Sequence, residues 1–235
     1  MDIKRLFHRK KTQNNNEEAL PEIVYINIPT LELSDEQLSQ CAELFSLNYG
    51  NYSDKSEYRP GERIKMGTAY YRRNYINKEY SVALALDDSR IVGQAFYIRK
   101  KYEKLGKNEI AGTMTWIVQL VVDSEYRRRG IASTLLRSIW GFSDDFAWGL
   151  ATANPCTIKT LESATMRKCK PAVIRRHLRD IRKIGKDIGF VKDSVIEVTE
   201  ASSQINSHFF VDNKEFLLEK KDVLLKNQRK IMPLF

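Results

Sequence analysis

The chain has 235 residues, which suits one domain of ordinary size with modest additions, and 42% of them are hydrophobic. Its charged fraction of 29% and its aromatic fraction of 10% exclude the composition of a disordered protein. The formal net charge is +9, and it is concentrated: nine Lys or Arg face only Asp180 and Asp187 between Arg167 and Asp187, which gives this segment +7.

Cysteine, histidine and hydropathy exclude several other classes of protein. The cysteines Cys41, Cys156 and Cys169 are odd in number and lack CxxC spacing, so they predict neither a disulfide framework nor a zinc site. The three histidines lie far apart, and we expect no metal. No apolar run approaches the ~20 residues of a membrane span, and the basic N-terminus lacks a signal core. We therefore expect a cytoplasmic protein without a transmembrane segment.

The predicted elements begin after a polar tail. Residues 1–20 contain few core-forming side chains, so we expect them to be flexible. Alternating side chains from Glu22 to Ile28 are typical of a strand. Ser34 and Gln37 then have the spacing of a capping box, which predicts a helix that ends near Gly50.

Helices and strands alternate through the rest of the chain. The pattern predicts, in order, a polar loop over 50–63, a helix over 64–75, strands over 81–86 and 91–99 joined by a hairpin turn, a strand over 113–122, a helix over 130–140, a strand over 146–153, a helix capped by Asn154 and Pro155, a basic helical stretch to about 186, strands over 189–199 and 204–211, and a charged helix over 214–230. This order indicates an α/β sandwich around a mixed sheet.

One segment carries most of the functional information. A predicted buried strand ends at Leu120-Val121-Val122, a short polar turn follows, and a helix begins at Gly130. A helix N-terminus offers unpaired N–H groups and a positive dipole end to phosphate oxygens, and a glycine there lets them approach the backbone. Arg127, Arg128 and Arg129 add positive charge. The segment therefore predicts a polyphosphate site.

Two common phosphate-binding motifs are excluded. Gly185-Lys186-Asp187 lacks the Ser or Thr of a Walker A loop, and no GxGxxG follows a strand. Arg127-x-x-Gly130-x-Ala132, preceded by Leu120-x-Val122-Asp-x-x-Tyr, instead resembles the central motif of the GNAT superfamily of N-acetyltransferases. The alternative is a turn glycine beside a solvated basic patch.

The resemblance implies a fold, a cofactor and a set of binding residues. It implies a GNAT-like α/β fold with a mixed, mostly antiparallel central sheet flanked by helices, here with a basic helical insertion at about 167–187. Its domain would span 21–213, followed by a C-terminal helix over 214–235. The cofactor would be acetyl-CoA, with its pyrophosphate at the loop and its pantetheine arm along the preceding strand. The implied cofactor-binding residues are Leu120, Val121, Val122, Arg127, Arg128, Arg129, Gly130, Ile131, Ala132, Ser133 and Asn154. Gly189-Phe190 resembles the Gly-Phe that precedes the last two strands of the family.

The catalytic residues stay unassigned. The family often places a Tyr seven residues after the Asn, but Leu161 stands at that position. Trp116 occupies the place of a Glu that serves some members as the base. Glu109, Tyr70, Tyr71, Gln119 and a bound water are alternatives, and a packing role is the expectation for Cys156. Catalysis by positioning alone is a further alternative.

The basic segment offers a possible partner surface. Its cations recur at helical spacing, with Ile174, Leu178 and Ile181 on the other side. An acidic partner such as RNA, DNA or an acidic protein is weighed here against a merely solvated face. The cations in question are Arg175, Arg176, Arg179, Arg182, Lys183 and Lys186.

Two functions follow from the sequence. The first is acetyl-CoA-dependent N-acetyl transfer to an amine of unknown identity, with a longer acyl donor as a variant. The second is a non-catalytic CoA-binding or interaction module of the same fold, docking an acidic macromolecule through the basic helix. We expect the acceptor site to be lined by residues 48–63 and by the last two strands.

Overall fold

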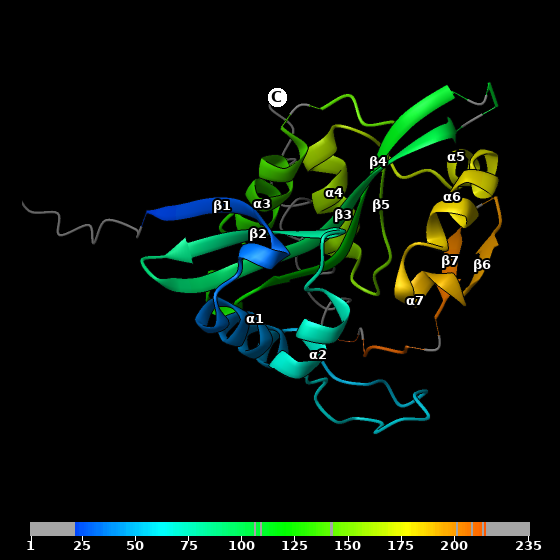
Figure 1. Cartoon of the computed structure of the whole chain (residues 1–235). Helices are drawn as coiled ribbons and strands as arrows, with labels where there is room; N and C mark the ends of the chain where they lie inside the picture. The colour runs from blue at the N-terminus through cyan, green and yellow to red at the C-terminus, as the bar shows by residue number, and fades with distance from the viewer. Residues whose placement is uncertain are drawn as a thin grey trace, which may run out of the picture.

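The computed structural model describes residues 22–105, 107–108, 110–141, 143–200, 202–207, 209–212 and 214 (Figure 1). Its elements are, in chain order, β1 (Ile23–Pro29), η1 (Thr30–Glu32), α1 (Asp35–Asn48), α2 (Thr68–Asn74), β2 (Tyr80–Asp87), β3 (Arg90–Leu105), β4 (Ile110–Val122), η2 (Ser124–Tyr126), α3 (Ile131–Trp140), β5 (Ala147–Leu150), α4 (Pro155–Thr165), α5 (Pro171–Arg176), α6 (Leu178–Gly185), α7 (Gly189–Lys192), β6 (Val195–Val198) and β7 (Ser203–Asn206). The predicted tail, and the C-terminal helix beyond Lys214, lie outside these residues.

The central sheet has five strands in the order β1-β2-β3-β4-β5. The first four run antiparallel to their neighbours, and β5 pairs parallel to β4. Helices α1 and α2 lie on one side of this sheet, and α3 and α4 lie on the other (Figure 1). The predicted mixed, mostly antiparallel sheet flanked by helices is confirmed.

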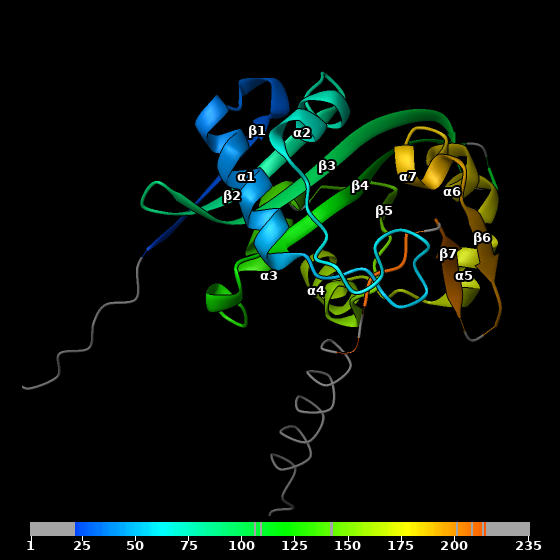
Figure 2. The same cartoon turned by 90° about the horizontal axis from the view of Figure 1, so that it is seen from below.

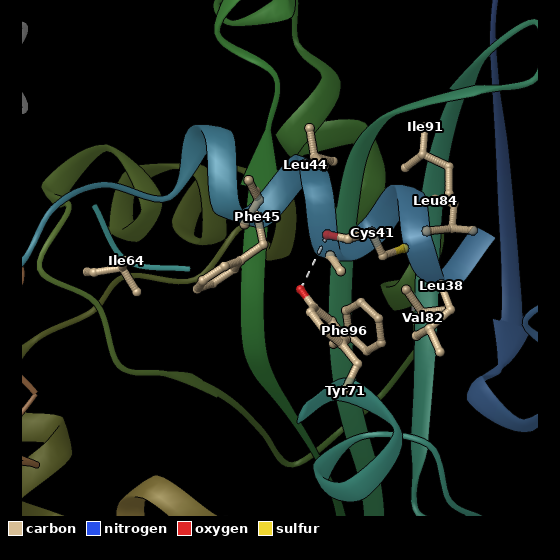
Figure 3. Packing of buried hydrophobic residues seen from close by; sticks show 12 residues of the cluster. Leu38, Cys41, Leu44, Phe45, Ile64, Tyr71, Val82, Leu84, Ile91 and Phe96 are labelled. Carbon is tan, nitrogen blue, oxygen red and sulfur yellow. Dashed lines mark hydrogen bonds between the residues drawn. The ribbon is translucent and has the colours of Figure 1, made fainter. Parts of the chain in front are cut away.

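Both faces of the sheet are covered, which explains the continuous burial of Val82 to Ala85 in β2. Leu38, Cys41 and Phe45 of α1 pack with Val82, Leu84 and Phe96 on one face (Figure 3). Leu135, Leu136 and Ile139 of α3 pack against Ala83 and Ala95 on the other. Helix α1 begins at the predicted capping box, where Ser34 Oγ accepts from Gln37 N and Gln37 Oε1 accepts from Ser34 N.

Strand β4 contains a bulge at Val118. Gln119 pairs with Phe96 and Ile117 pairs with Tyr97, so Val118 is the extra residue in the ladder. Before the bulge, Met114 and Trp116 face the side of the sheet that packs with α7. After it, Val121 faces the α1 core. The bulge therefore lies where β4 changes its neighbours.

The C-terminal elements form a small module at the far end of β3 and β4, as both views show (Figures 1 and 2). Ile184, Ile188 and Val191 of this module are buried with Ile98, Met114 and Trp116 of the sheet. Strands β6 and β7 pair with each other in a separate two-stranded sheet. We name α5, α6, α7, β6 and β7 the C-terminal module.

Several predicted boundaries are wrong in this half of the chain. Gly189-Phe190 opens the short helix α7, and the strand starts only at Val195. The last strand ends at Asn206, whereas Val211 makes an isolated bridge with Tyr52. The basic stretch is two helices, α5 and α6, interrupted at His177.

The second helix is also shorter than predicted. It begins at Thr68 instead of Ile64, because Gly67 has an extended backbone and forms the N-cap. Ile64 is buried in the α1 core, next to the bridge between Asn51 and Arg63. Ile64 therefore belongs to a loop that packs on the core, although its spacing to the following apolar residues is that of a helix. Among the described helices, none is both long and apolar enough to cross a bilayer.

Candidate active site

A groove of about 370 Å³ runs between the end of β4, the start of α3 and the start of α4. The structure brings together in its lining all of the residues predicted to bind the cofactor except Arg129. Those lining residues are Leu120, Val121, Val122, Arg127, Arg128, Gly130, Ile131, Ala132, Ser133 and Asn154.

The N-terminus of α3 opens onto this groove. Its N-cap is Gly130, at φ +83°, and none of the described side chains caps the first turn. The hydroxyls of Ser133 and Thr134 donate to the Gly130 carbonyl. Residues 130–133 line the groove, and the first N–H groups of a helix have no partner within the helix. A Cβ at Gly130 would meet only Ser133 Oγ, at 3.9 Å, so the approach to the backbone is open.

The β4 side of the groove is an exposed strand edge. Strand β4 pairs with β3 as far as Val122, but its pairing with β5 ends at Ile117 and Leu150. Beyond that point β4 and the chain after β5 diverge. The backbone of Leu120 to Val122 therefore faces the groove with the hydrogen-bonding pattern of a strand edge, which an extended ligand can pair with.

The three arginines have different surroundings. Arg127 donates from Nη2 to the Asn48 carbonyl at 2.8 Å and from Nε to the Val122 carbonyl at 3.4 Å. Arg128, exposed and left-handed at φ +65°, lines the groove. The Arg129 guanidinium lies 5.0 Å from the Tyr126 ring centroid and does not line the groove. The three arginines are therefore not equivalent: Arg127 lines the groove and is held by backbone carbonyls, Arg128 lines the groove and is exposed, and Arg129 stacks on Tyr126 outside it.

Polar contacts hold the turn before α3 in place. The Asp123 carboxylate accepts from Glu125 N at 3.0 Å and from Arg90 Nη2 at 2.6 Å. Asn48 Oδ1 accepts from Ser124 N at 2.8 Å. Asn48 therefore connects the end of α1 to this turn through both its side chain and its carbonyl. Sequence reasoning placed Asn48 at the start of the acceptor-site segment 48–63 and did not predict its contacts with this turn.

Asn154 has a structural task at the opposite wall. Its Oδ1 accepts from Cys156 N at 2.8 Å, and so caps α4 as the sequence predicted. Cys156 and Thr157 line the groove in the same first turn. The groove is thus bordered by the N-termini of two helices, both of which favour negative charge.

A second hollow, of about 1150 Å³, adjoins the groove. We name it the apolar hollow. It extends between β4, β5, the loop after α1 and the C-terminal module, and Figure 2 shows that loop in cyan between α4 and the C-terminal strands. Four residues line both spaces: Tyr49, Thr152, Ala153 and Val211. The loop and last-strand residues expected at an acceptor site, such as Ser53, Asp54 and Ile205, do line this hollow.

A buried polar network lies beside the junction of the two spaces. Tyr71 Oη donates to Gln119 Oε1 at 2.7 Å, and Gln94 Nε2 donates to the same oxygen at 2.5 Å. Burial raises the pKa of Tyr71 far above its ordinary value, so its hydroxyl stays protonated. Gln119 lines the apolar hollow, whereas Tyr71 is buried behind it. Tyr71 therefore positions Gln119.

The other candidates for proton transfer differ in where they lie relative to the groove and the apolar hollow. Tyr70 lines the apolar hollow and is exposed, while Glu109 lies outside the described residues. Tyr49, at the junction, stacks on Phe45 with ring centroids 4.3 Å apart. Burial raises the pKa of Tyr49 to about 12. Its phenol is therefore a protonated group at neutral pH.

The structure also brings a His–Asp pair into the apolar hollow. His177 Nδ1 lies 3.3 Å from Asp180 Oδ2, and the His177 ring contacts Phe146 edge-on. Both residues of the pair line the hollow. Sequence reasoning found no placed histidine, although the spacing of three residues between His177 and Asp180 was visible as a helical pair.

The basic face keeps the predicted orientation. All six of its cations are exposed, whereas Ile174, Leu178 and Ile181 are partly buried. Arg175 lies 3.9 Å from Glu200, and Lys183 donates to the Lys104 carbonyl at 3.1 Å. Among the described residues no group of His, Cys, Asp or Glu has the arrangement of a metal site.

The groove suits a phosphorylated, extended ligand, because it combines an open helix N-terminus, a basic side chain and a strand edge. Comparison with known proteins found a family match over residues 41–146, to the acetyltransferase (GNAT) family. No match was found among curated proteins.

Comparison with solved structures found several acetyltransferases. The chain is similar to an aminoglycoside acetyltransferase from an uncultured soil metagenomic sample, in complex with sisomicin (17% identity, 63% of this chain and 88% of that chain, TM-score 0.42). It is similar to an aminoglycoside N-acetyltransferase in complex with CoA (13% identity, 64% and 91%, TM-score 0.43). It is also similar to a ribosomal-protein-alanine N-acetyltransferase from Brucella melitensis biovar Abortus 2308 (13% identity, 63% and 93%, TM-score 0.42).

Proposed function

On the premise that the chain belongs to the acetyltransferase (GNAT) family over residues 41–146, we propose that it is an N-acetyltransferase that uses acetyl-CoA to acetylate an amine. One observation carries the proposal: a helix N-terminus without a side-chain cap and a strand edge without a partner strand, both as judged from the described residues, border the same groove. The first suits a pyrophosphate and the second suits the amides of a pantetheine arm.

Each wall of the groove has a binding task in this proposal. The N–H groups at the start of α3, together with Arg128, hold the pyrophosphate. The backbone of Leu120 to Val122 pairs with the pantetheine arm. Arg127 acts indirectly, because its contacts to the Asn48 and Val122 carbonyls fix the turn that carries Arg128. Acetyl-CoA supplies the activated acetyl group, and the protein orients it toward the junction with the apolar hollow.

The transfer requires a neutral amine, a stabilised carbonyl oxygen and a proton for the departing thiolate. The amine enters from the apolar hollow, whose low polarity favours its uncharged form. Tyr49 is the group we nominate to donate the proton to the sulfur, because it lines both spaces and stays protonated at neutral pH.

The binding site is tested by calorimetric titration of CoA into the protein and into Gly130→Glu. The added carboxylate lies at the helix N-terminus, where it repels the pyrophosphate, and we expect at least a roughly tenfold loss of affinity. Gly141→Glu is the matched control, since Gly141 caps the other end of the same helix, is also left-handed at φ +54°, and has open space around its Cβ position.

Equal affinity of the wild type and Gly130→Glu would exclude the groove as the CoA site. An assay of acetyl transfer distinguishes an enzyme from a CoA-binding module without turnover. The transfer to amines is measured through the release of free CoA thiol. A module binds CoA with the same dependence on Gly130 and releases no thiol in the presence of any amine.

A further inference from the structure

We propose that the acceptor amine is carried on a large apolar body, and that this body occupies the apolar hollow between the β4–β5 edge and the C-terminal module. The proposal rests on the proposed function, because it names the substrate class of the same site. The hollow, at about 1150 Å³, exceeds the roughly 300–1,000 Å³ of ordinary small-molecule pockets.

Hydrocarbon and aromatic side chains form much of the wall of the hollow, and charged and polar side chains form the rest. Met114, Trp116 and Val118 of β4 line one wall, and at the rise of a strand they extend over roughly 13 Å. Ile181 and Ile184 of α6 line the same hollow from the C-terminal module. An acceptor of comparable length and low polarity would gain most from burial against these side chains.

The charged residues that line the hollow do not favour the binding of a polycation. Four Asp or Glu and five Lys or Arg line it, so the acidic side chains do not prevail. A polyamine or another substrate with several ammonium groups would need an excess of carboxylates to replace its hydration. The lining thus favours a molecule with one amine and an apolar remainder.

The position of the hollow determines where the amine lies. The hollow meets the groove at Tyr49, Thr152, Ala153 and Val211, where the thioester of a bound acyl-CoA would end. The opposite end is marked by Phe146, which precedes the β5 residue paired with Met114. The amine therefore lies at the junction, and the apolar body extends along β5 toward Phe146.

The residues at the Phe146 end of the hollow favour the body of the acceptor as its occupant, in preference to a long acyl chain of the donor. His177 and Asp180 line the hollow beside Phe146, with side chains 33% and 13% exposed. A hydrocarbon chain end at this pair, whether of donor or acceptor, would remove water from it without offering a hydrogen-bond partner, so we expect the natural ligand to carry a polar group there. An acceptor with a polar group remote from its amine satisfies the pair.

The test is acetyl transfer from acetyl-CoA to n-alkylamines from butylamine to octylamine, with spermidine as the polycation. Burial of one methylene is worth about 0.8 kcal/mol, so we expect kcat/KM to rise about fourfold per methylene. Spermidine should be a poorer substrate than octylamine. In a second series, butylamine is held constant and acetyl-, hexanoyl- and decanoyl-CoA are compared, and we expect no gain with acyl length.

A pair of variants locates the effect. Val173 lines the hollow and is 41% exposed, whereas Val195 is 53% exposed and lies outside its lining. Val173→Asp should lower kcat/KM for octylamine at least tenfold and leave CoA affinity unchanged, because a carboxylate replaces part of the apolar wall. Val195→Asp, with the same chemical change on the same module, should leave both values unchanged.

The outcomes separate the two proposals. The proposal of an apolar acceptor is overturned by any of three results: a kcat/KM that does not change along the amine series, a higher kcat/KM for spermidine than for octylamine, or a kcat/KM that rises with acyl length. None of these results contradicts acetyl transfer itself. Calorimetry of octylamine without CoA gives the independent readout. Octylamine binding that depends on chain length and on Val173, in a protein that binds no CoA, supports the hollow and overturns the proposed function instead.

Discussion

At the scale of single residues, Gly149 of β5 shows how closely the central sheet is packed. A Cβ at this position would overlap the ring of Trp116 on the neighbouring strand and would lie 2.8 Å from Met114 Cε. Trp116 is 4% exposed and forms part of the wall of the apolar hollow. Gly149 therefore fixes the position of that wall.

Gly149→Ala should lower the free energy of unfolding by about 1–3 kcal/mol, the usual cost of overpacking. Urea denaturation measures this value. Gly189→Ala is the control, since its Cβ would have no neighbour within 4 Å, and we expect little change or a slight gain. Equal stability of the wild type and Gly149→Ala would contradict the packing described here.

Tyr49→Phe tests the nominated proton donor. Tyr49 lines both spaces, and the substitution keeps the ring that stacks on Phe45 and removes only the hydroxyl. We expect kcat to fall by about a hundredfold or more, with CoA affinity unchanged, because proton donation contributes about that factor. An unchanged kcat with the best amine would remove Tyr49 from the mechanism.

Sequence reasoning identified the groove residues because their chemistry is local. Gly130 and its neighbours form one continuous turn, so their roles follow from a single helix start. It placed Asn48 and Tyr49 only in the segment expected at the acceptor site, and it could not predict the contacts of Asn48 with the turn before α3, which form because α1 packs across β4. It also treated Arg127 and Arg129 alike, although one donates to backbone carbonyls and the other stacks on Tyr126.

At the scale of elements, two helix caps of similar chemistry have different expected effects. Ser34 caps α1 away from the groove, and Asn154 caps α4 within its lining. Ser34→Ala and Asn154→Ala should each lower the free energy of unfolding by about 1 kcal/mol. Only Asn154→Ala should also weaken CoA binding, because it loosens a helix start that borders the groove. Calorimetry and urea denaturation on both variants provide the comparison, and an equal effect on CoA affinity would contradict the assignment.

Elements with strong local signals were predicted well. The capping box of α1, the hairpin between β2 and β3, and the start of α3 each depend on residues close in sequence. The error at Gly189 has a tertiary cause: Ile188 and Val191 are buried against the sheet as part of a short helix, which their apolar character alone did not distinguish from a strand.

At the scale of the whole molecule, the buried thiol and phenols of the α1 core make stability depend on alkaline pH. Burial raises the pKa of Cys41 from 9.0 to about 12, and it raises the pKa of Tyr49 to about 12. A group whose pKa is higher in the folded state stabilises the fold below its unfolded pKa, and this contribution is lost as pH rises toward the folded value.

We therefore expect the free energy of unfolding to fall between about pH 9 and pH 12, by up to about 1.4 kcal/mol per pH unit for each such group. Urea denaturation at pH 8, 9.5 and 10.5 measures the slope. Cys41→Ala should reduce the slope although it lowers stability at pH 8. Constant stability across this range would be incompatible with a buried, protonated Cys41.

The architecture of the central sheet was predictable, whereas the arrangement of the C-terminal module was not. The order of alternating patterns predicted an α/β sandwich around a mixed sheet, and the family resemblance implied that this sheet is mostly antiparallel, as the structure has it. Strands β6 and β7 have four residues each and are largely exposed, and their pattern did not reveal that they form a two-stranded sheet separate from the central one.

The extra residue at Val118 changes the parity of β4. On one side of it the even-numbered side chains Met114 and Trp116 border the apolar hollow, and beyond it the even-numbered Leu120 and Val122 turn to the α3 face. The bulge at Val118 therefore determines which side chains of β4 line the apolar hollow and which pack on the α3 face beside the groove. Removing it would exchange inside and outside for one half of the strand, a change that no substitution in β4 could reproduce.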